Sequence, residues 1–187
     1  PQDTRFGQSG VDVHPSYLIL QMPDSDTEEF VLMLPFSPAG DKKNLVGWLT
    51  ARNDGKHYGE LNAFVVPSDP QVDGPAQVEA RIENDQTISQ QFTLWDGAGS
   101  QVVRGQLLVI PVGDAIIYVE PLYLQSEVLA FPELKKVILA DGSNVVMADS
   151  VGEGLAMLLE GGALPDGLPG GAAGVGGDGQ AIPGHEG

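Results

Sequence analysis

Residues 107–125 read LLVIPVGDAIIYVEPLYLQ, an almost unbroken apolar stretch in a chain whose formal net charge is −17. A membrane-spanning helix needs about 20 predominantly apolar residues. This stretch is interrupted by Pro111, Gly113, Asp114, Glu120 and Pro121. Val, Ile and Tyr dominate on either side of Pro-Val-Gly-Asp, which is typical of a β-hairpin. Because both halves are apolar without alternation, we expect strands at 102–110 and 115–120 that are covered on both faces.

Composition restricts the class of protein and its partners. A chain of 187 residues with 42% apolar content is long enough for one domain with a core. Its 26 acidic and 9 basic residues argue against nucleic-acid binding, because phosphates require clustered Lys and Arg, and they disfavour docking on anionic lipid. The absence of cysteine excludes disulfides, thiolate nucleophiles and zinc–thiolate sites.

Further hairpins and helices follow from turn and spacing signals. Asn53-Asp54-Gly55 and Asp141-Gly142 are turn signals between apolar runs. The expected strands before residue 75 are 17–22, 30–34, 45–52 and 59–66, and a further hairpin is expected within 134–148. A helix at 43–52 is an alternative, since Leu45 and Leu49 also fit helical spacing, but Gly47 favours the strand. Pro121 and Pro132 are expected to bracket an extended connection.

Three short helices are expected. The segment PAQVEARIEND opens with proline and carries Val78 and Ile82 four residues apart. A second helix over TISQQFTLWD would begin with Thr87 as its cap and end at Asp96. Its apolar face would comprise Ile88, Phe92 and Trp95. Ser150 and Glu153 form a capping-box pattern ahead of a helix at 151–160.

The predicted fold is therefore α+β, with mostly antiparallel β-hairpins, two or three short helices and a disordered glycine-rich C-terminal tail. We divide the chain into a loose N-terminal segment (1–16), one α+β domain (17–160) and a flexible tail (161–187). The tail contains a formal match to the dinucleotide fingerprint at 174–179. It lacks the flanking strand and helix that this motif requires, so we assign it no function.

The titratable residues suggest structure rather than chemistry. His14, His57 and His185 are far apart in sequence and each is expected in a loop or the tail. The acidic turn between the first two strands lacks the ligand spacing of a calcium loop, so we expect a solvated hairpin tip. Its acidic residues are Asp24, Asp26, Glu28 and Glu29. Trp48 and Trp95 are expected to be core anchors.

Two arginines, Arg81 and Arg104, are expected to form structural ion pairs. Their candidate partners are Glu79, Glu83, Asp85 and Asp96. A hydrolase-like alternative would use Asp85, Asp96 or Asp114 for general acid–base work, and would require two carboxylates to converge in a cleft. We assign no catalytic, cofactor-binding or metal-binding residue and expect no cofactor.

Several segments resemble the C-terminal soluble portion of uncharacterised protein family 0182, over about residues 17 to 160. They are EFVLMLPF (29–36), GWLTAR (47–52), YGELNAF (58–64), EARIENDQTISQQFTLWDGAGSQVVRG (79–105), LLVIPVGDAIIYVEPLYLQ (107–125) and PELKKVILADGSNVVMA (132–148). The resemblance implies a large bacterial membrane protein whose transmembrane helices lie upstream of residue 1, and a position on the extracytoplasmic face of the membrane. It brings no catalytic residues.

The leading functional hypothesis is a non-enzymatic protein-interaction or assembly module, with a protein partner or self-association through sheet edges. An acidic hydrolase-like enzyme domain and a divalent-cation-binding domain are the alternatives. The N-terminal residues PQDTRFGQSG lack the basic and apolar regions of a signal peptide. We therefore expect any export signal to lie upstream of residue 1.

Overall fold

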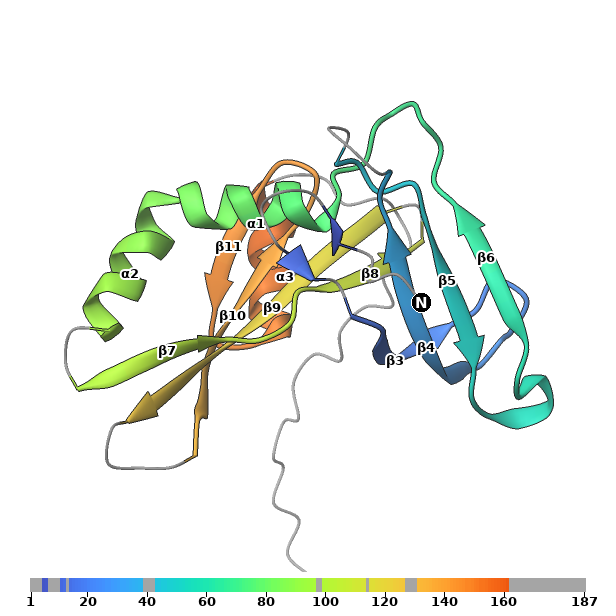
Figure 1. Ribbon diagram of the computed structural model, residues 1–187, viewed down its shortest axis with the longest axis horizontal. Helices are drawn as coiled ribbons and strands as arrows, with labels where there is room; N and C mark the ends of the chain where they lie inside the picture. The colour runs from blue at the N-terminus through green and yellow to red at the C-terminus, as the bar shows by residue number, and fades with distance from the viewer. Residues whose placement is uncertain are drawn as a thin grey trace, which may run out of the picture.

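The computed structural model confirms an α+β fold with two antiparallel sheets and three α-helices (Figure 1). It describes residues 5–6, 11–12, 14–38, 43–96, 99–113, 115–126 and 131–161. Two short strands, β1 (Arg5–Phe6) and β2 (Val11–Asp12), pair with each other near the N-terminus. The predicted tail, with its 174–179 motif, lies outside the described residues except for Gly161.

The four-stranded sheet has the order β3-β4-β5-β6, and each strand pairs antiparallel with the next. Its strands are β3 (Ser16–Gln21), β4 (Glu28–Phe36), β5 (Gly47–Arg52) and β6 (Leu61–Val65), with a 3₁₀ turn, η1 (Gly55–His57), before β6. These positions confirm the predicted hairpins, and the helical alternative at 43–52 is wrong. Gly47 begins β5, and a Cβ there would lie 2.2 Å from the Phe64 carbonyl oxygen, so the close approach of β6 requires glycine at this position.

The five-stranded sheet is arranged around one long strand, β9, which pairs with β10 on one side and with both β7 and β8 on the other. Its strands are β7 (Ser100–Arg104), β8 (Leu108–Val112), β9 (Ala115–Ser126), β10 (Glu133–Ala140) and β11 (Val145–Ala148). The hairpin of β10 and β11 is confirmed. The prediction of a single strand at 102–110 is wrong, as is that of a connection starting at Pro121.

Both errors have one cause. The Gly105 N–H donates to the Pro121 carbonyl at 2.8 Å, so Pro121 faces the junction of β7 and β8. Proline has no N–H to offer on that side, and the ladder is interrupted there. A Cβ at Gly105 would lie 2.6 Å from Pro121 Cγ, so only glycine allows this approach.

The three helices are α1 (Pro75–Asn84), α2 (Gln86–Asp96) and α3 (Val151–Gly161), close to the predicted ranges. Thr87 is not the cap of α2. Asp85 accepts a hydrogen bond from the Ile88 N–H at 2.9 Å instead, because the cap lies two residues earlier than predicted. Ser150 caps α3 as predicted, accepting from the Glu153 N–H at 3.2 Å.

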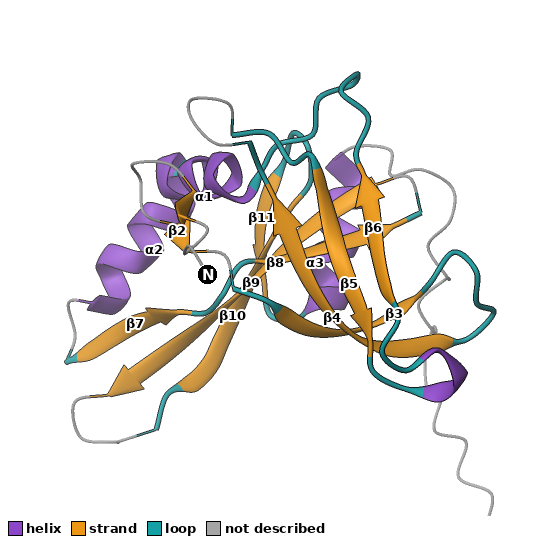
Figure 2. Cartoon of the chain, turned by 45° about the vertical axis from the view of Figure 1, so that its right-hand side comes forward, coloured by secondary structure: helices purple, strands orange, loops and turns teal. Residues whose placement is uncertain are grey.

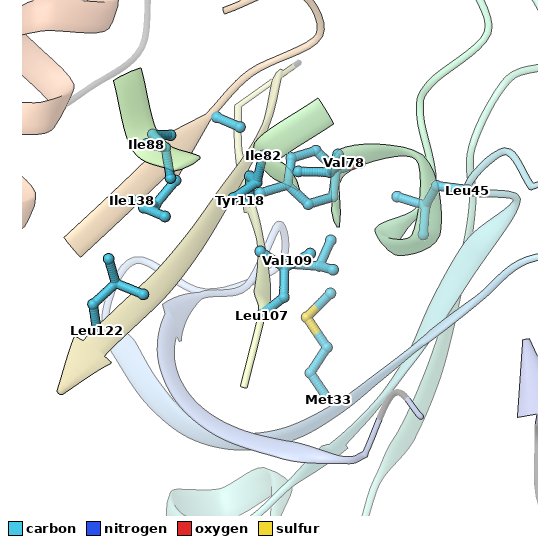
Figure 3. Packing of buried hydrophobic residues seen from close by; sticks show 11 residues of the cluster. Met33, Leu45, Val78, Ile82, Ile88, Leu107, Val109, Tyr118, Leu122 and Ile138 are labelled. Carbon is cyan, nitrogen blue, oxygen red and sulfur yellow. The ribbon is translucent and has the colours of Figure 1, made fainter. Parts of the chain in front are cut away.

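Two apolar clusters cover the two faces of the five-stranded sheet. One contains Val78, Ile82 and Ile88 of α1 and α2, and it reaches Met33 of the four-stranded sheet (Figure 3). The other joins Leu158 of α3 to alternate residues of β9 and β10. The apolar stretch 107–125 is therefore core, as predicted. Among the described residues, no helix is long and apolar enough to span a bilayer.

Candidate functional site

The most unusual surface belongs to the four-stranded sheet. Along each strand, alternate side chains point either toward the core shared with α1 and α2 or to the opposite side, which we call the outer face. Leu18, Met33 and Trp48 point to the core side. The strand register places the following residues together on the outer face: Tyr17, Ile19, Gln21, Glu28, Phe30, Leu32, Leu34, Phe36, Gly47, Leu49, Ala51, Leu61, Ala63 and Val65.

Apart from the pair Gln21 and Glu28 at one end, this outer face is apolar from β3 to β6, and its side chains are exposed or half-buried. Ile19 and Leu61 are each 67% exposed, and Val65 is 84% exposed. Tyr17 and Phe30 stack with ring centroids 5.1 Å apart, which fixes both rings on the surface. An antiparallel sheet with one solvated face normally alternates apolar and polar residues, and these strands do not. Figure 2 shows the sheet beside the rest of the fold.

β6 also ends its sheet in the described part of the chain. The Val66 N–H donates to Val46 and the Arg52 N–H donates to Glu60, so even-numbered residues of this strand bond toward β5. The backbone groups of the odd-numbered residues Leu61, Ala63 and Val65 consequently point outward. No charged residue or proline interrupts β6, so its edge lacks the features that discourage strand pairing.

An arginine cluster closes one end of the four-stranded sheet on the core side. Arg52 is fully buried and its guanidinium contacts three carboxylates. Its Nε donates to Glu29 at 2.6 Å, its Nη1 to Asp24 at 2.9 Å, and Glu60 lies 3.5 Å away. These hydrogen bonds hold the pKa values of Glu29 and Asp24 below their ordinary values of 4.5 and 3.8. Arg52 thereby joins β5 to the β3–β4 turn and to the start of β6.

The prediction of a solvated acidic hairpin tip is confirmed for Asp24, Asp26 and Glu28, which are exposed, and is wrong for Glu29, which is buried. Asp24 is exposed and also bound to Arg52. The carboxylates gather around a guanidinium, and the described residues contain no group of His, Asp and Glu placed to hold a metal ion. Sequence reasoning missed Arg52, although its alternation with Trp48 and Thr50 puts it on the core side.

A second arginine cluster lies on the five-stranded sheet beneath α1. Arg104 donates to the buried Glu120 at 2.5 and 2.7 Å and pairs with Glu79, while Glu83 lies 3.5 Å away. Its guanidinium also lies 5.8 Å from the Phe92 ring centroid. Burial, together with the charge of Glu120, raises the pKa of Glu79. The predicted structural pairs of Arg104 with Glu79 and Glu83 are confirmed.

Arg81 forms a structural ion pair, as predicted, but with a different partner. It pairs with Asp73 and donates to the Asp141 carbonyl at 3.1 Å, so it ties α1 to the β10–β11 turn. The hydroxyl of Tyr118 donates to the Asp73 carbonyl, and burial raises the pKa of Tyr118. Neither arginine cluster leaves an unpaired nucleophile or base aimed into a cleft among the described residues.

The carboxylates of the hydrolase-like alternative do not converge. Asp85 accepts the Ile88 N–H at the start of α2, and Asp96 accepts the Val102 N–H at 2.7 Å at its end. Eleven helical steps of about 1.5 Å separate them by roughly 16 Å. Asp114 lies outside the described residues, as does His185.

The remaining predicted residues have structural positions. His57 contacts Glu60 at 2.9 Å, and the His14 carbonyl accepts from Gln106 at 2.6 Å. Trp48 and Trp95 pack against the core, which confirms them as anchors.

The comparisons with known proteins agree on one family. The model of "Uncharacterised protein family (UPF0182)" matches residues 1–95. A UPF0182 protein of Desulfitobacterium hafniense is 48% identical over 82% of this chain and 17% of its own length. One from Pelotomaculum thermopropionicum is 48% identical over 81% of this chain and 16% of its own length. One from Prochlorococcus marinus is 44% identical over 83% of this chain and 16% of its own length.

The chain thus spans about a sixth of the length of the curated relatives that it matches. No solved structure matches it. Because the family model covers half of the chain and relatives at 44–48% identity cover more than four fifths of it, this chain belongs to the uncharacterised protein family UPF0182.

Proposed function

We propose that this region of UPF0182 proteins is a non-enzymatic assembly module that docks onto an apolar protein surface through the outer face. The observation that carries the proposal is the continuous apolar surface from β3 to β6. Large contiguous apolar patches are rare on soluble proteins, and those that occur commonly mark interaction sites.

The size of the outer face supports a docking role. Four strands about 4.8 Å apart, each about six residues long at about 3.3 Å per residue, give a flat footprint of roughly 400 Å². Projecting side chains make the accessible area larger than this flat footprint, so burying it at about 25 cal/mol per Å² contributes at least about 10 kcal/mol before the entropic cost of association. Leaving it in water forgoes this gain and favours aggregation, so a covered face is the favourable state.

The charged clusters support a role without catalysis. In each cluster an arginine occupies the position between the carboxylates, and the arginine is itself held by two or more hydrogen bonds. Such groups stabilise the sheet ends rather than offer a proton or a nucleophile to a substrate. The hydrolase-like alternative receives no support from Asp85 and Asp96, which bind backbone N–H groups at opposite ends of α2.

The extracytoplasmic position that the family resemblance implies is part of the proposal. It can be tested in the full-length Desulfitobacterium hafniense relative by placing a cysteine at the position matching Leu94 and labelling intact cells with a membrane-impermeant maleimide. We expect labelling without lysis. Labelling that requires lysis would contradict the location without affecting the docking role.

Paired substitutions test the docking role itself, because Leu61 on the outer face and Leu94 on α2 have nearly equal exposure, 67% and 66%. In this chain alone, Leu61→Asp and Leu94→Asp are expected to leave the midpoint of thermal unfolding within a few degrees of the parent, since neither residue is buried. In the full-length relative, aspartate at the position matching Leu61 should lower the yield of folded protein several-fold. Aspartate at the position matching Leu94 should not. Equal tolerance of both changes in the full-length protein would refute the docking role.

A second candidate, self-association through the sheet edge, is favoured by the open edge of β6. Its outward-pointing backbone groups offer a template for a strand of another copy. Size-exclusion chromatography with light scattering tests this candidate. A dimer that dissociates on Ala63→Pro, which leaves the β5-facing bonds of β6 intact, would support edge pairing, and a strictly monomeric species at high concentration would exclude it.

A further inference from the structure

We propose that the outer face is covered in cis, by another region of the longer UPF0182 polypeptide, and that a second copy of this chain is not its partner. This inference rests on the docking role proposed above and names the occupant of the same surface. Three observations carry it: the length of the relatives, the tethering that a single polypeptide provides and the distribution of charge.

The first observation concerns length. The matched region is only 16–17% of each relative's polypeptide, so roughly five sixths of that polypeptide lies outside it. The longer polypeptide therefore offers other surface against which the outer face can pack, and larger chains bury a greater fraction of their surface.

The second observation concerns tethering. A segment of the same polypeptide faces an effective concentration of about millimolar or more at the outer face, whereas a second copy has only its bulk concentration. A segment in cis therefore outcompetes a second copy of similar intrinsic affinity.

The third observation concerns charge. A symmetric pair of copies would bring the same surface patch against itself. Each copy has a formal net charge of −17, and the end of the outer face where β3 meets β4 carries the exposed Glu28. Two such faces would repel each other, whereas another region of the polypeptide can present complementary basic residues around an apolar centre.

The side chains also indicate the chemistry of the occupant. Tyr17 and Phe30 are stacked, and β-sheet backbone holds Ile19 and Leu32 beside them, so this half of the face is preorganised and loses little entropy on binding. We infer an occupant with an aliphatic or aromatic surface and with Lys or Arg at its rim.

Thiol accessibility tests the inference, because the chain has no cysteine of its own. One cysteine replaces Ile19, which is 67% exposed on β3 and distant from the β6 edge, and in a separate variant one replaces Leu94 as the matched control. Both positions lie within the residues that the family model matches. The rate of maleimide labelling is measured in this chain over a range of concentrations and in the full-length Desulfitobacterium hafniense relative at the matching positions.

We expect Ile19→Cys to label rapidly in this chain at every concentration, and its counterpart to label at least about tenfold more slowly in the full-length protein, because the thiol would react only when the covered face opens. The Leu94→Cys rates calibrate intrinsic labelling in each protein. Protection of Ile19→Cys that appears in this chain as its concentration rises, with dimers seen by light scattering, would overturn the occupant in cis while leaving the docking role intact. Rapid labelling in both proteins would overturn the docking role as well.

Discussion

The two sheets of the molecule have similarly apolar strands and different surroundings. In both β9 of the five-stranded sheet and β4 of the four-stranded sheet, apolar side chains point to both faces of the strand. In β9, Tyr118 packs with α1 while Val119 packs in the cluster of α3, so both faces are covered. In β4, Met33 packs against the core while Phe30 remains exposed.

This difference shows how to interpret a strand that lacks alternation. Apolar residues on both faces predict two covering layers, and the described part of the chain supplies both for one sheet and only one for the other. The four-stranded sheet thus has the composition of a central layer and the surroundings of a surface layer. The comparison is informative because the chain is about a sixth of the length of its relatives.

The largest expected effect compares how much a buried leucine of the five-stranded sheet and an exposed leucine of the four-stranded sheet contribute to the free energy of unfolding. Leu139 of β10 is fully buried, and Gly154 of α3 lies so close that a Cβ there would be 2.3 Å from Leu139 Cδ1. Leu139→Ala should lower the free energy of unfolding by about 3–4 kcal/mol, because the cavity is enclosed by the helix. Leu61→Ala on the outer face should lower it by less than about 1 kcal/mol. Urea denaturation of the isolated chain measures both, and equal losses would break the comparison.

The next effect concerns the junction that lets β9 serve two partner strands. Gly105→Ala would place its Cβ 2.6 Å from the Pro121 ring, which has no rotamer in which to move away. We expect a loss of about 1–3 kcal/mol in the free energy of unfolding. Gly142→Ala is the control, since a Cβ there meets nothing within 4 Å, and it should be neutral or stabilise by up to about 1 kcal/mol. A neutral Gly105→Ala would mean that β7 and β8 do not depend on this contact.

Gly105 also marks the limit of what the sequence predicts. Hairpins such as β5–β6 and β10–β11 are encoded locally, by Asn53-Asp54-Gly55 and Asp141-Gly142, and their strands were predicted correctly. The break at Gly105 depends on Pro121, which is 16 residues away and opposite it only in the folded register. From the sequence alone, Pro121 indicates the end of a strand. Only the tertiary structure shows that Pro121 lies within β9, beside a break in the ladder where proline is tolerated.

The same limit applies to the candidate site. Arg52 finds Glu29 across the β3–β4–β5 sheet, 23 residues away in sequence, so the pair follows from strand register and not from spacing. The outer face likewise becomes visible only when the three strand registers of the sheet are combined, since each strand separately is simply apolar. Predicted ion pairs succeeded for Arg104 because α1 presents Glu79 and Glu83 on one helical face.

The two arginine clusters, one on each sheet, should give opposite pH dependences. Arg52 lowers the pKa of Glu29, so this carboxylate adds stability above its ordinary pKa of 4.5 that is lost as the pH falls through the lower folded value. Burial raises the pKa of Glu79, so its contribution is present below 4.5 and is lost as the pH rises through the higher folded value.

Glutamine substitutions separate these two contributions. Glu29→Gln should flatten the loss of unfolding free energy on acidification below pH 4.5, and Glu79→Gln should flatten the decline just above pH 4.5. Urea unfolding at a series of pH values between about 3 and 7 gives both slopes. If the two variants changed the slope in the same pH range and direction, the opposite electrostatic character of the two clusters would be disproved.

The smallest expected effect is that of Val65→Thr on the outer face. A negligible change at this position is informative because the same substitution at the buried Val137 should be clearly destabilising. Val65 is 84% exposed on the outer face and Val137 is 4% exposed in β10. Threonine has nearly the same shape and strand preference as valine, so Val→Thr only replaces one methyl group by a hydroxyl at each site. In the isolated chain we expect Val65→Thr to change the free energy of unfolding by less than about 0.5 kcal/mol, and Val137→Thr to lower it by about 1–3 kcal/mol because the hydroxyl is buried.

In the full-length relative, threonine at the position matching Val65 should also become destabilising, since the outer face is then covered. A Val65→Thr change that remained neutral in the longer protein would mean that this part of the sheet stays in water, and that its apolar surface needs another explanation.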